Sequence, residues 1–356
     1  MFDDIRPYAD AEIPAAMQRI VAYPEFRAVC GYLFPDKPFD RVAERVASCR
    51  TIDEFQDRFM VPVVESIMAQ STAGVTVEGM EKLDPDQRYL FVANHRDITL
   101  DATFFQVLLR RAGLRTTEIT FGANLMQGGL VVDLGKSNKM FRVERPTTVS
   151  SPRAFLTSCV RLSEYIRWTI LEKRESIWIA QRNGRTKDGV DATDQGIIKM
   201  FSLAGDILDL RIVPLAVSYE WEPCDAFKAA EITALERDGS YEKKPGEDLQ
   251  SILTGITQPK GRVHYTVCDP VTAKDLAPWQ ALPVNTFCRE TAALIDRRIR
   301  AGYRIWPNNR IAADYVEGTS SGGYTSREKA AFEAHLSSIP EELRPVVRKI
   351  YAGPLL

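Results

Sequence analysis

Short apolar runs typical of strands alternate with amphipathic stretches typical of helices between residues 75 and 303. Parallel strands need long crossover connections, and helices usually supply them. The alternation therefore predicts an α/β fold with a mostly parallel central sheet flanked by helices. The predicted strands are 89–93, 116–121, 139–144, 176–181, 211–219 and 262–268, and the main helices are 98–109, 152–173, 195–204 and 284–303.

The residues before this alternation are predicted to be helical. Apolar side chains recur there at three- and four-residue spacing, which is the helical period. We expect one large α/β domain with appended helical regions, although the length also allows two or three average domains. The predicted helices are 11–20, 39–48 and 52–69, and the predicted regions are 1–72 (N-terminal helical region), 73–312 (α/β domain) and 313–356 (C-terminal helical tail).

Composition limits the classes of function. The formal net charge is −2, so no global field favours nucleic acid, and any anion must be bound by a local cluster of cations. No run approaches the roughly 20 apolar residues of a spanning helix, and the acidic N-terminus lacks a signal-peptide core. We expect a cytoplasmic protein, either soluble or peripheral at the inner membrane face. The three histidines are far apart in the sequence and the six cysteines form no CxxC pair, so no metal site is predicted.

The segment 94–97 follows a predicted strand and opens a predicted helix. Ligands and catalytic groups collect at such turns in open α/β sheets. His95 has the residue type of a general base, and a carboxylate is needed to orient its second ring nitrogen. Asp97 and Asp101 are both candidates for that carboxylate. The alternative is that Asp97 only caps the helix and His95 is an ordinary polar loop residue.

Cations gather in two other segments that end predicted strands. Arg145 closes the strand 139–144, and the loop 181–189 holds two arginines, a lysine and two glycines. Arginine forks match pairs of phosphate oxygens, and glycines permit tight turns. The alternative for Arg145 is a solvated strand end with a Glu/Arg pair, and the alternative for the loop 181–189 is a solvated, flexible loop. The candidate anion-binding residues are Arg145, Arg182, Arg185 and Lys187, and Asn183 and Gly184 would shape the loop.

The order and spacing of these segments resemble the glycerolipid acyltransferase family over residues 75–270. Members of that family esterify glycerol 3-phosphate or 1-acylglycerol 3-phosphate with acyl groups from acyl-CoA or acyl carrier protein. The family's four blocks are a His/Asp motif, a phenylalanine-rich strand ending in arginine, a Glu-Gly-x-Arg-Ser loop and a strand with proline. The segments that resemble these blocks are 94–101, 141–145, 183–186 and 213–214.

The resemblance implies a mechanism without a covalent acyl-enzyme. His95, oriented by Asp101, would remove the proton of the acceptor hydroxyl, which then attacks the thioester. The cations would hold the acceptor phosphate, the acyl donor would be a co-substrate, and no cofactor is expected. The apolar groove for the acyl chain would be lined by Phe104, Phe105 and Leu108, although core packing is the alternative for these side chains.

Two departures from the family pattern affect the expected site. Five residues, not four, separate His95 from Asp101, and Leu100 occupies the usual place of the acid. The turn can absorb the extra residue, so we favour Asp101 as the orienting acid, with Asp97 as the alternative. The loop also lacks the customary glutamate, and Asn183 or Arg182 stands there.

Two other classes of function remain open on the sequence alone. A thioester hydrolase could use the same His/Asp pair on water. A catalytically silent lipid- or anion-binding module could retain the fold without turnover. The partners predicted for the favoured class are a phosphorylated glycerol acceptor, acyl-CoA or acyl carrier protein, and peripheral contact with a membrane.

Overall fold

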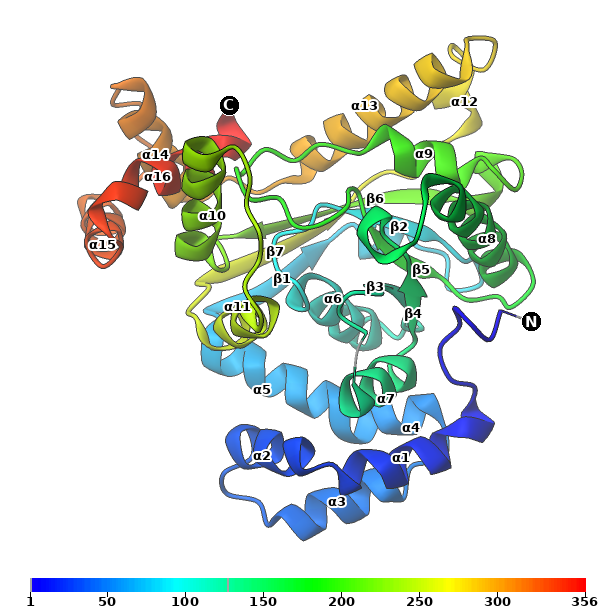
Figure 1. The fold of residues 1–356 in the computed structure, drawn as a ribbon. Helices are drawn as coiled ribbons and strands as arrows, with labels where there is room; N and C mark the ends of the chain where they lie inside the picture. Colours follow the sequence, from blue (N-terminus) through cyan, green and yellow to red (C-terminus); the bar gives the residue numbers. More distant parts are fainter. Residues whose placement is uncertain (1, 127) are drawn as a thin grey trace.

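The computed structural model describes residues 2–126 and 128–356. Its centre is a seven-stranded sheet in the order β1-β7-β6-β2-β5-β3-β4 (Figure 1). Met1, the first residue of the predicted N-terminal region, lies outside the described residues. The strands are β1 (Gly74–Glu78), β2 (Leu90–Ala93), β3 (Glu118–Gly122), β4 (Met140–Val143), β5 (Ile177–Ala180), β6 (Ile212–Tyr219) and β7 (Arg262–Val267).

The sheet is mostly parallel, as the sequence predicts. Among the described strands, every neighbouring pair is parallel except β6 and β7, which are antiparallel with Val217 opposite Tyr265. Strands β2 to β6 therefore point their carboxyl ends to one edge. The turns after β2, β3, β4 and β5 meet at that edge, where ligand sites form in open α/β sheets.

The N-terminal helices cover one face of the sheet (Figure 1). A single apolar cluster joins their side chains, such as Ile20 and Phe55, to sheet residues such as Phe91 and Trp178. The predicted N-terminal region thus shares a core with the α/β domain. The elements of this layer are α1 (Ile13–Ala22), α2 (Pro24–Leu33), α3 (Phe39–Ala47), α4 (Ile52–Phe55), a π-helical stretch (Gln56–Met60), α5 (Val61–Ser71), α6 (Leu100–Arg111) and α7 (Gly129–Ser137).

The opposite face of the sheet carries a second apolar cluster beneath α8, α9 and α13. A third cluster joins α10 to the last three long helices, away from the sheet (Figure 1). No helix of the described residues is both long and apolar enough to cross a membrane. The remaining α-helices are α8 (Pro152–Leu171), α9 (Gln195–Phe201), α10 (Asp225–Asp238), α11 (Glu247–Thr257), α12 (Ala273–Leu276), α13 (Val284–Gly302), α14 (Pro307–Glu317), α15 (Ser326–Ser337) and α16 (Arg344–Ala352).

Short 3₁₀ turns complete the connections. The predicted boundary at residues 312/313 falls inside α14, which packs against α15 and α16 and so belongs with the tail. The two helices α2 and α7 lie in segments for which no helix is predicted. The 3₁₀ turns are Asp10–Glu12, Met80–Lys82, Pro146–Thr148, Ile207–Leu210, Glu341–Leu343 and Gly353–Leu355.

Candidate active site

A cavity of about 560 Å³ opens at the carboxyl edge of the sheet. Its walls include His95 after β2, Gly122 at the end of β3, Arg145 after β4 and the loop 182–187 after β5. The sequence analysis places these segments at one edge, and the structure brings them to one cavity. They are far apart along the chain, so the parallel sheet is what assembles them.

The side chains of His95 and Asp101 are hydrogen-bonded at one end of this cavity. Nδ1 of His95 lies 2.9 Å from Oδ2 of Asp101, whose side chain is 1 % exposed. The same oxygen accepts hydrogen bonds from the backbone N–H groups of Arg96 (2.6 Å) and Asp97 (2.9 Å). The other oxygen, Oδ1, accepts from the hydroxyl of Tyr219 at 2.7 Å. The carboxylate is therefore fixed from the backbone and from the sheet.

Asp97 has a different environment and makes no contact with His95. Its Oδ1 accepts hydrogen bonds from the backbone N–H groups of Thr99 and Leu100, both at 2.9 Å, and so caps helix α6. Its Oδ2 has no hydrogen-bond partner among the described residues, and burial together with the nearby Asp101 raises the pKa of the Asp97 carboxyl. The capped turn absorbs the extra residue of the motif, because the helix begins at Leu100 and Asp101 lies in its first turn.

The imidazole of His95 faces the cavity in a defined orientation. Its ring meets Trp178 edge to face, with centroids 5.8 Å apart. With Nδ1 bonded to Asp101, Nε2 has no partner among the described residues, and the side chain lines the cavity. The backbone carbonyl of His95 accepts from the N–H of Thr186 at 2.7 Å, which ties the loop after β5 to this turn.

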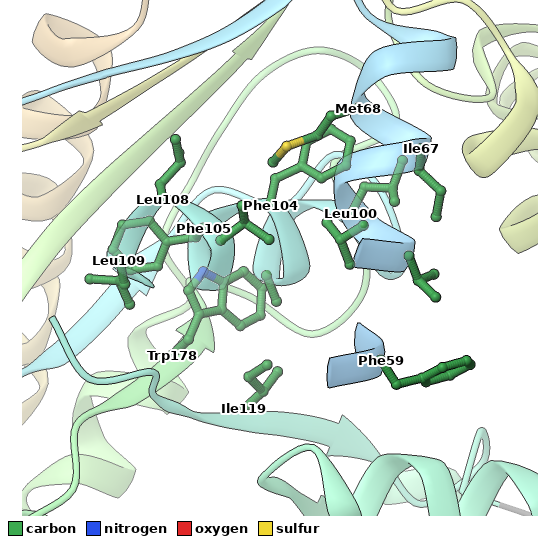
Figure 2. Close-up of a cluster of buried hydrophobic side chains, with 14 of the residues drawn as sticks. Phe59, Ile67, Met68, Leu100, Phe104, Phe105, Leu108, Leu109, Ile119 and Trp178 are labelled. Atoms are coloured by element: carbon green, nitrogen blue, oxygen red, sulfur yellow. The ribbon is translucent and has the colours of Figure 1, made fainter. Parts of the chain in front are cut away.

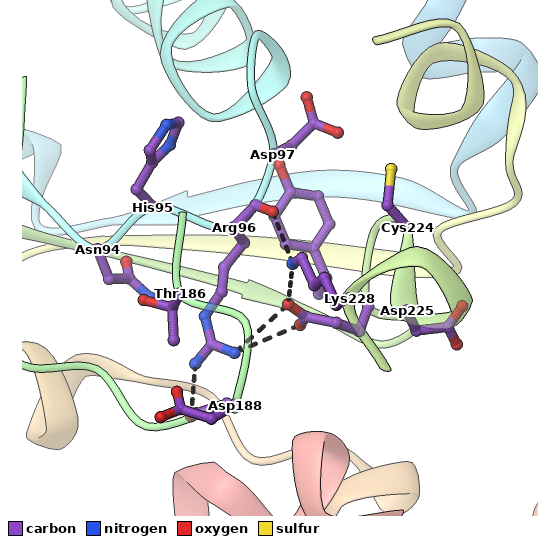
Figure 3. A network of polar contacts seen from close by, with 12 residues as sticks. Asn94, His95, Arg96, Asp97, Thr186, Asp188, Cys224, Asp225 and Lys228 are labelled. Carbon is purple, nitrogen blue, oxygen red and sulfur yellow. Dashed lines mark hydrogen bonds and ion pairs between the residues drawn. The ribbon is translucent and has the colours of Figure 1, made fainter. Parts of the chain in front are cut away.

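Arg96 points away from His95 into a buried polar network (Figure 3). Its guanidinium, 1 % exposed, lies 2.7 Å from Asp191 and 3.4 Å from Glu222. Lys228 donates to the carbonyl of Arg96 (2.7 Å) and to Glu222 (2.6 Å). Because all of these groups are buried and mutually paired, Arg96 holds the turn in place and is not available to a ligand.

Three arginines of the cavity wall form no ion pair with the described residues: Arg145, Arg182 and Arg185. Arg145 lies against Gly122, where a Cβ would come within 3.0 Å of the guanidinium, and burial lowers its pKa. One nitrogen of the Arg185 guanidinium is buried without a hydrogen-bond partner. A ligand with anionic oxygens would satisfy these groups.

Lys187 is the exception among the predicted cations. It lines the cavity but forms an ion pair with Glu231 of α10, and burial is the main cause that lowers its pKa. Gly184, with φ +77°, provides the turn in the loop, and Asn183 lies beside it in the cavity wall.

Several residues of the site are absent from the sequence prediction. Lys243 and Asp248, paired with each other, reach the cavity from the connection between α10 and α11 and from the start of α11. No motif marks that segment. Tyr219 and Trp178 lie in predicted strands, but the apolar pattern of those strands indicates core side chains and not site residues.

The residues predicted to line an apolar groove for the acyl chain do not lie at the cavity. Phe104, Phe105 and Leu108 pack in the core between α6, the sheet and the N-terminal helices (Figure 2) and do not line the cavity. Helix α6 is buried on nearly every side, so its apolar pattern cannot indicate which face meets the ligand. The apolar wall is formed by Ile98, Ala102, Ile119, Phe121, Leu125, Met140, Val143, Phe155, Leu162, Trp178, Ile179, Ile197 and Met200.

One comparison with known protein families matches the region that carries this site. Residues 74–218 match the family model described as Acyltransferase, which spans β1 to the end of β6 apart from its last residue. No protein of curated function matches the sequence. The structure is similar to the 1-acyl-sn-glycerophosphate (LPA) acyltransferase PlsC from Thermotoga maritima, with 16 % identity and a TM-score of 0.39 over 82 % of this chain and 96 % of that chain.

Proposed function

We propose that this chain, whose residues 74–218 match the family model described as Acyltransferase, is a glycerolipid acyltransferase that acylates a glycerol phosphate. The proposed reaction moves a fatty acyl group from a thioester, acyl-CoA or acyl carrier protein, to the hydroxyl of glycerol 3-phosphate or 1-acylglycerol 3-phosphate. One observation carries the proposal: His95, which is bonded to Asp101, lines one cavity together with an apolar wall and three arginines that form no ion pair with the described residues.

In this mechanism His95 is the general base. Asp101 holds Nδ1, so Nε2 can accept the proton of the acceptor hydroxyl. The hydroxyl oxygen attacks the thioester carbonyl, the C–O bond of the ester forms, and the C–S bond breaks. The imidazolium, stabilised by the Asp101 carboxylate, returns the proton to the departing thiolate. No other nucleophile is required.

The two kinds of cavity wall suit the two parts of the reaction. Arg145, Arg182 and Arg185 each offer paired hydrogen-bond donors to a phosphate. None of these arginines forms an ion pair with the described residues. The apolar wall of β3, β5, α8 and α9 residues offers a surface for an acyl chain. An amphiphilic product would therefore fit with its phosphate and its chain in separate places.

The proposal is tested by measuring thiol release and ester formation with purified protein. Glycerol 3-phosphate and 1-acylglycerol 3-phosphate are each paired with acyl-CoA and with acyl carrier protein. We expect acceptor-dependent ester formation, and we expect His95→Ala to lower the rate by roughly two to four orders of magnitude. Thiol release without any acceptor would instead identify a hydrolase, and binding without turnover would identify a silent module.

A further inference from the structure

The buried side of the Asp101 carboxylate meets a tyrosine that lies outside the cavity. Tyr219 is the last residue of β6, is 1 % exposed, and donates its hydroxyl to Oδ1 of Asp101 at 2.7 Å. It is not among the residues of the cavity wall. Its hydroxyl therefore lies away from the cavity, bonded to the acid of the pair and next to the side chain of Tyr265.

The two carboxylate oxygens of Asp101 have different hydrogen-bond partners. Oδ2 takes His95 and two backbone N–H groups, whereas Oδ1 takes only Tyr219 among the described residues. Without the phenol, Oδ1 would be a buried anionic oxygen with no donor, and buried charge without donors is strongly disfavoured. The carboxylate would then be free to turn away from His95.

We propose that Tyr219 is a positioning residue of the acyl transfer, which holds Oδ2 of Asp101 toward His95. The inference rests on the proposed function, because it assumes that the His95–Asp101 pair does the chemistry. It adds a third member to that pair, contributed by a strand that the sequence motif of residues 94–101 does not include.

The placement of Tyr219 follows from the sheet. β6 is the strand between β2, which leads to His95, and β7, whose Tyr265 donates to the backbone carbonyl of Asp101 at 2.9 Å. Two tyrosines of adjacent strands thus hold the first turn of α6 against the sheet, one through the side chain of Asp101 and one through its backbone. Only the first can change the chemistry of the carboxylate.

The inference predicts the direction of a change in pH dependence. A phenol that donates to Asp101 disperses its negative charge, so removing the phenol leaves more charge to stabilise the imidazolium of His95. The acid limb of kcat/KM should then move to higher pH. The other titratable groups near Asp101 are Asp97, Tyr265 and Tyr303, and all of them stay in place in this variant.

The test compares Tyr219→Phe with Tyr165→Phe. Tyr165 is also a fully buried phenol bonded to a buried carboxylate, Glu118, but on the opposite face of the sheet. We expect Tyr219→Phe to lower kcat by about tenfold or more, with both KM values within about twofold, and to move the acid limb upward. Tyr165→Phe should leave the acid limb where it is.

A second measurement covers a Tyr219→Phe variant that does not fold. Site-specific replacement of Tyr219 by 3-fluorotyrosine keeps the hydroxyl but makes it a stronger donor, so the acid limb should move to lower pH. Unchanged kcat and an unmoved acid limb in Tyr219→Phe, or an unmoved limb with fluorotyrosine, would overturn the inference while His95→Ala remains inactive. Full activity of His95→Ala would instead overturn the proposed function and this inference with it.

Discussion

Asp97 and Asp101 are four residues apart, yet the structure gives them different tasks. Asp101→Asn should lower kcat by about 10³–10⁴-fold, because an amide cannot stabilise the imidazolium or fix its tautomer. Asp97→Asn should keep most of the activity, since asparagine caps helices about as well as aspartate and burial already favours an uncharged group there. Steady-state kinetics on both variants checks this; a crippled Asp97→Asn beside an active Asp101→Asn would reverse the assignment.

Arg145 and Arg185 are expected to act on the acceptor and not on the acyl donor. Replacing either with alanine should raise the acceptor KM, since a lost charge-assisted hydrogen bond costs about 1.5–3 kcal/mol. Lysine should restore only part of the affinity, because it keeps the charge without the paired geometry. KM values for both substrates provide the measurement.

Two cations of the same loop serve as internal comparisons for this prediction. Lys187→Ala should change the acceptor KM less than Arg185→Ala, because Lys187 is already paired with Glu231. Arg182→Ala should resemble Arg185→Ala if the altered loop is an anion site, since Arg182 also lacks an ion pair. A rise in donor KM for all three arginines would show that they bind the phosphates of the donor instead.

Which single residues meet at the cavity could be predicted from the sequence only where a motif named them. His95, Asp101 and the arginines of the loop were found through their residue types and spacing. Phe104 and Phe105 were misplaced because an apolar pattern on a helix buried on all sides does not distinguish the core from a ligand. Lys243 and Tyr219 had no local signal, because only the folded chain brings them to the site.

At the scale of elements, the loop after β5 depends on the last helix of the chain. Gly189 has φ +83°, and a Cβ there would lie 2.0 Å from the carbonyl oxygen of Ile350 in α16. Gly189→Ala should therefore lower the free energy of unfolding by more than about 2 kcal/mol, through backbone strain and the clash together. Denaturant titration gives the value.

Gly184 is the matched control for that substitution. It has a similar φ of +77°, but a Cβ there would meet no atom within 4 Å. Gly184→Ala should cost only the conformational penalty of about 1–2 kcal/mol. Equal losses for the two variants would contradict the idea that the contact with α16 holds this loop.

The strands β2 to β7 and most long helices could be predicted because their local patterns agree with the fold, whereas the edge strand β1 is not among the predicted strands. The helices α2 and α7 were missed for local reasons. Pro24 reads as a break but occupies the first turn of α2, where proline is tolerated. Helix α7 begins with glycine and contains Gly135, so contacts stabilise it where propensity does not: its Asp133 accepts hydrogen bonds from Tyr8, Arg19 and Tyr23.

At the scale of the whole molecule, the C-terminal helices support the active-site turn from a distance. Val347, Ile350 and Tyr351 of α16 are buried in the cluster with α10, and the Tyr351 hydroxyl donates to Asp225 at 2.9 Å. Helix α10 also carries Lys228, which bonds to the carbonyl of Arg96. The described contacts therefore run from the tail to the residue after His95.

Deletion of residues 344–356 should consequently destabilise the protein and reduce transfer together. Losing these apolar side chains and leaving Asp225 with fewer partners should cost at least about 3 kcal/mol. Deletion of only Leu355 and Leu356, which are 41 % and 65 % exposed, should change little. Unfolding and activity assays on both truncations measure this, and a stable, fully active 1–343 chain would show that the tail is dispensable.

The single backbone hydrogen bond from Thr186 to the carbonyl of His95 has a consequence for redesign of this enzyme. Residues 182–185 lie on the cavity side of that bond, so their identities can be exchanged to recruit acceptors with a different head group. Insertions or deletions there would move Thr186 and, through its hydrogen bond, would displace His95. A graft that keeps the loop length up to Thr186 should therefore leave His95 in place, so that under the proposed mechanism it would change the acceptor and not the general base.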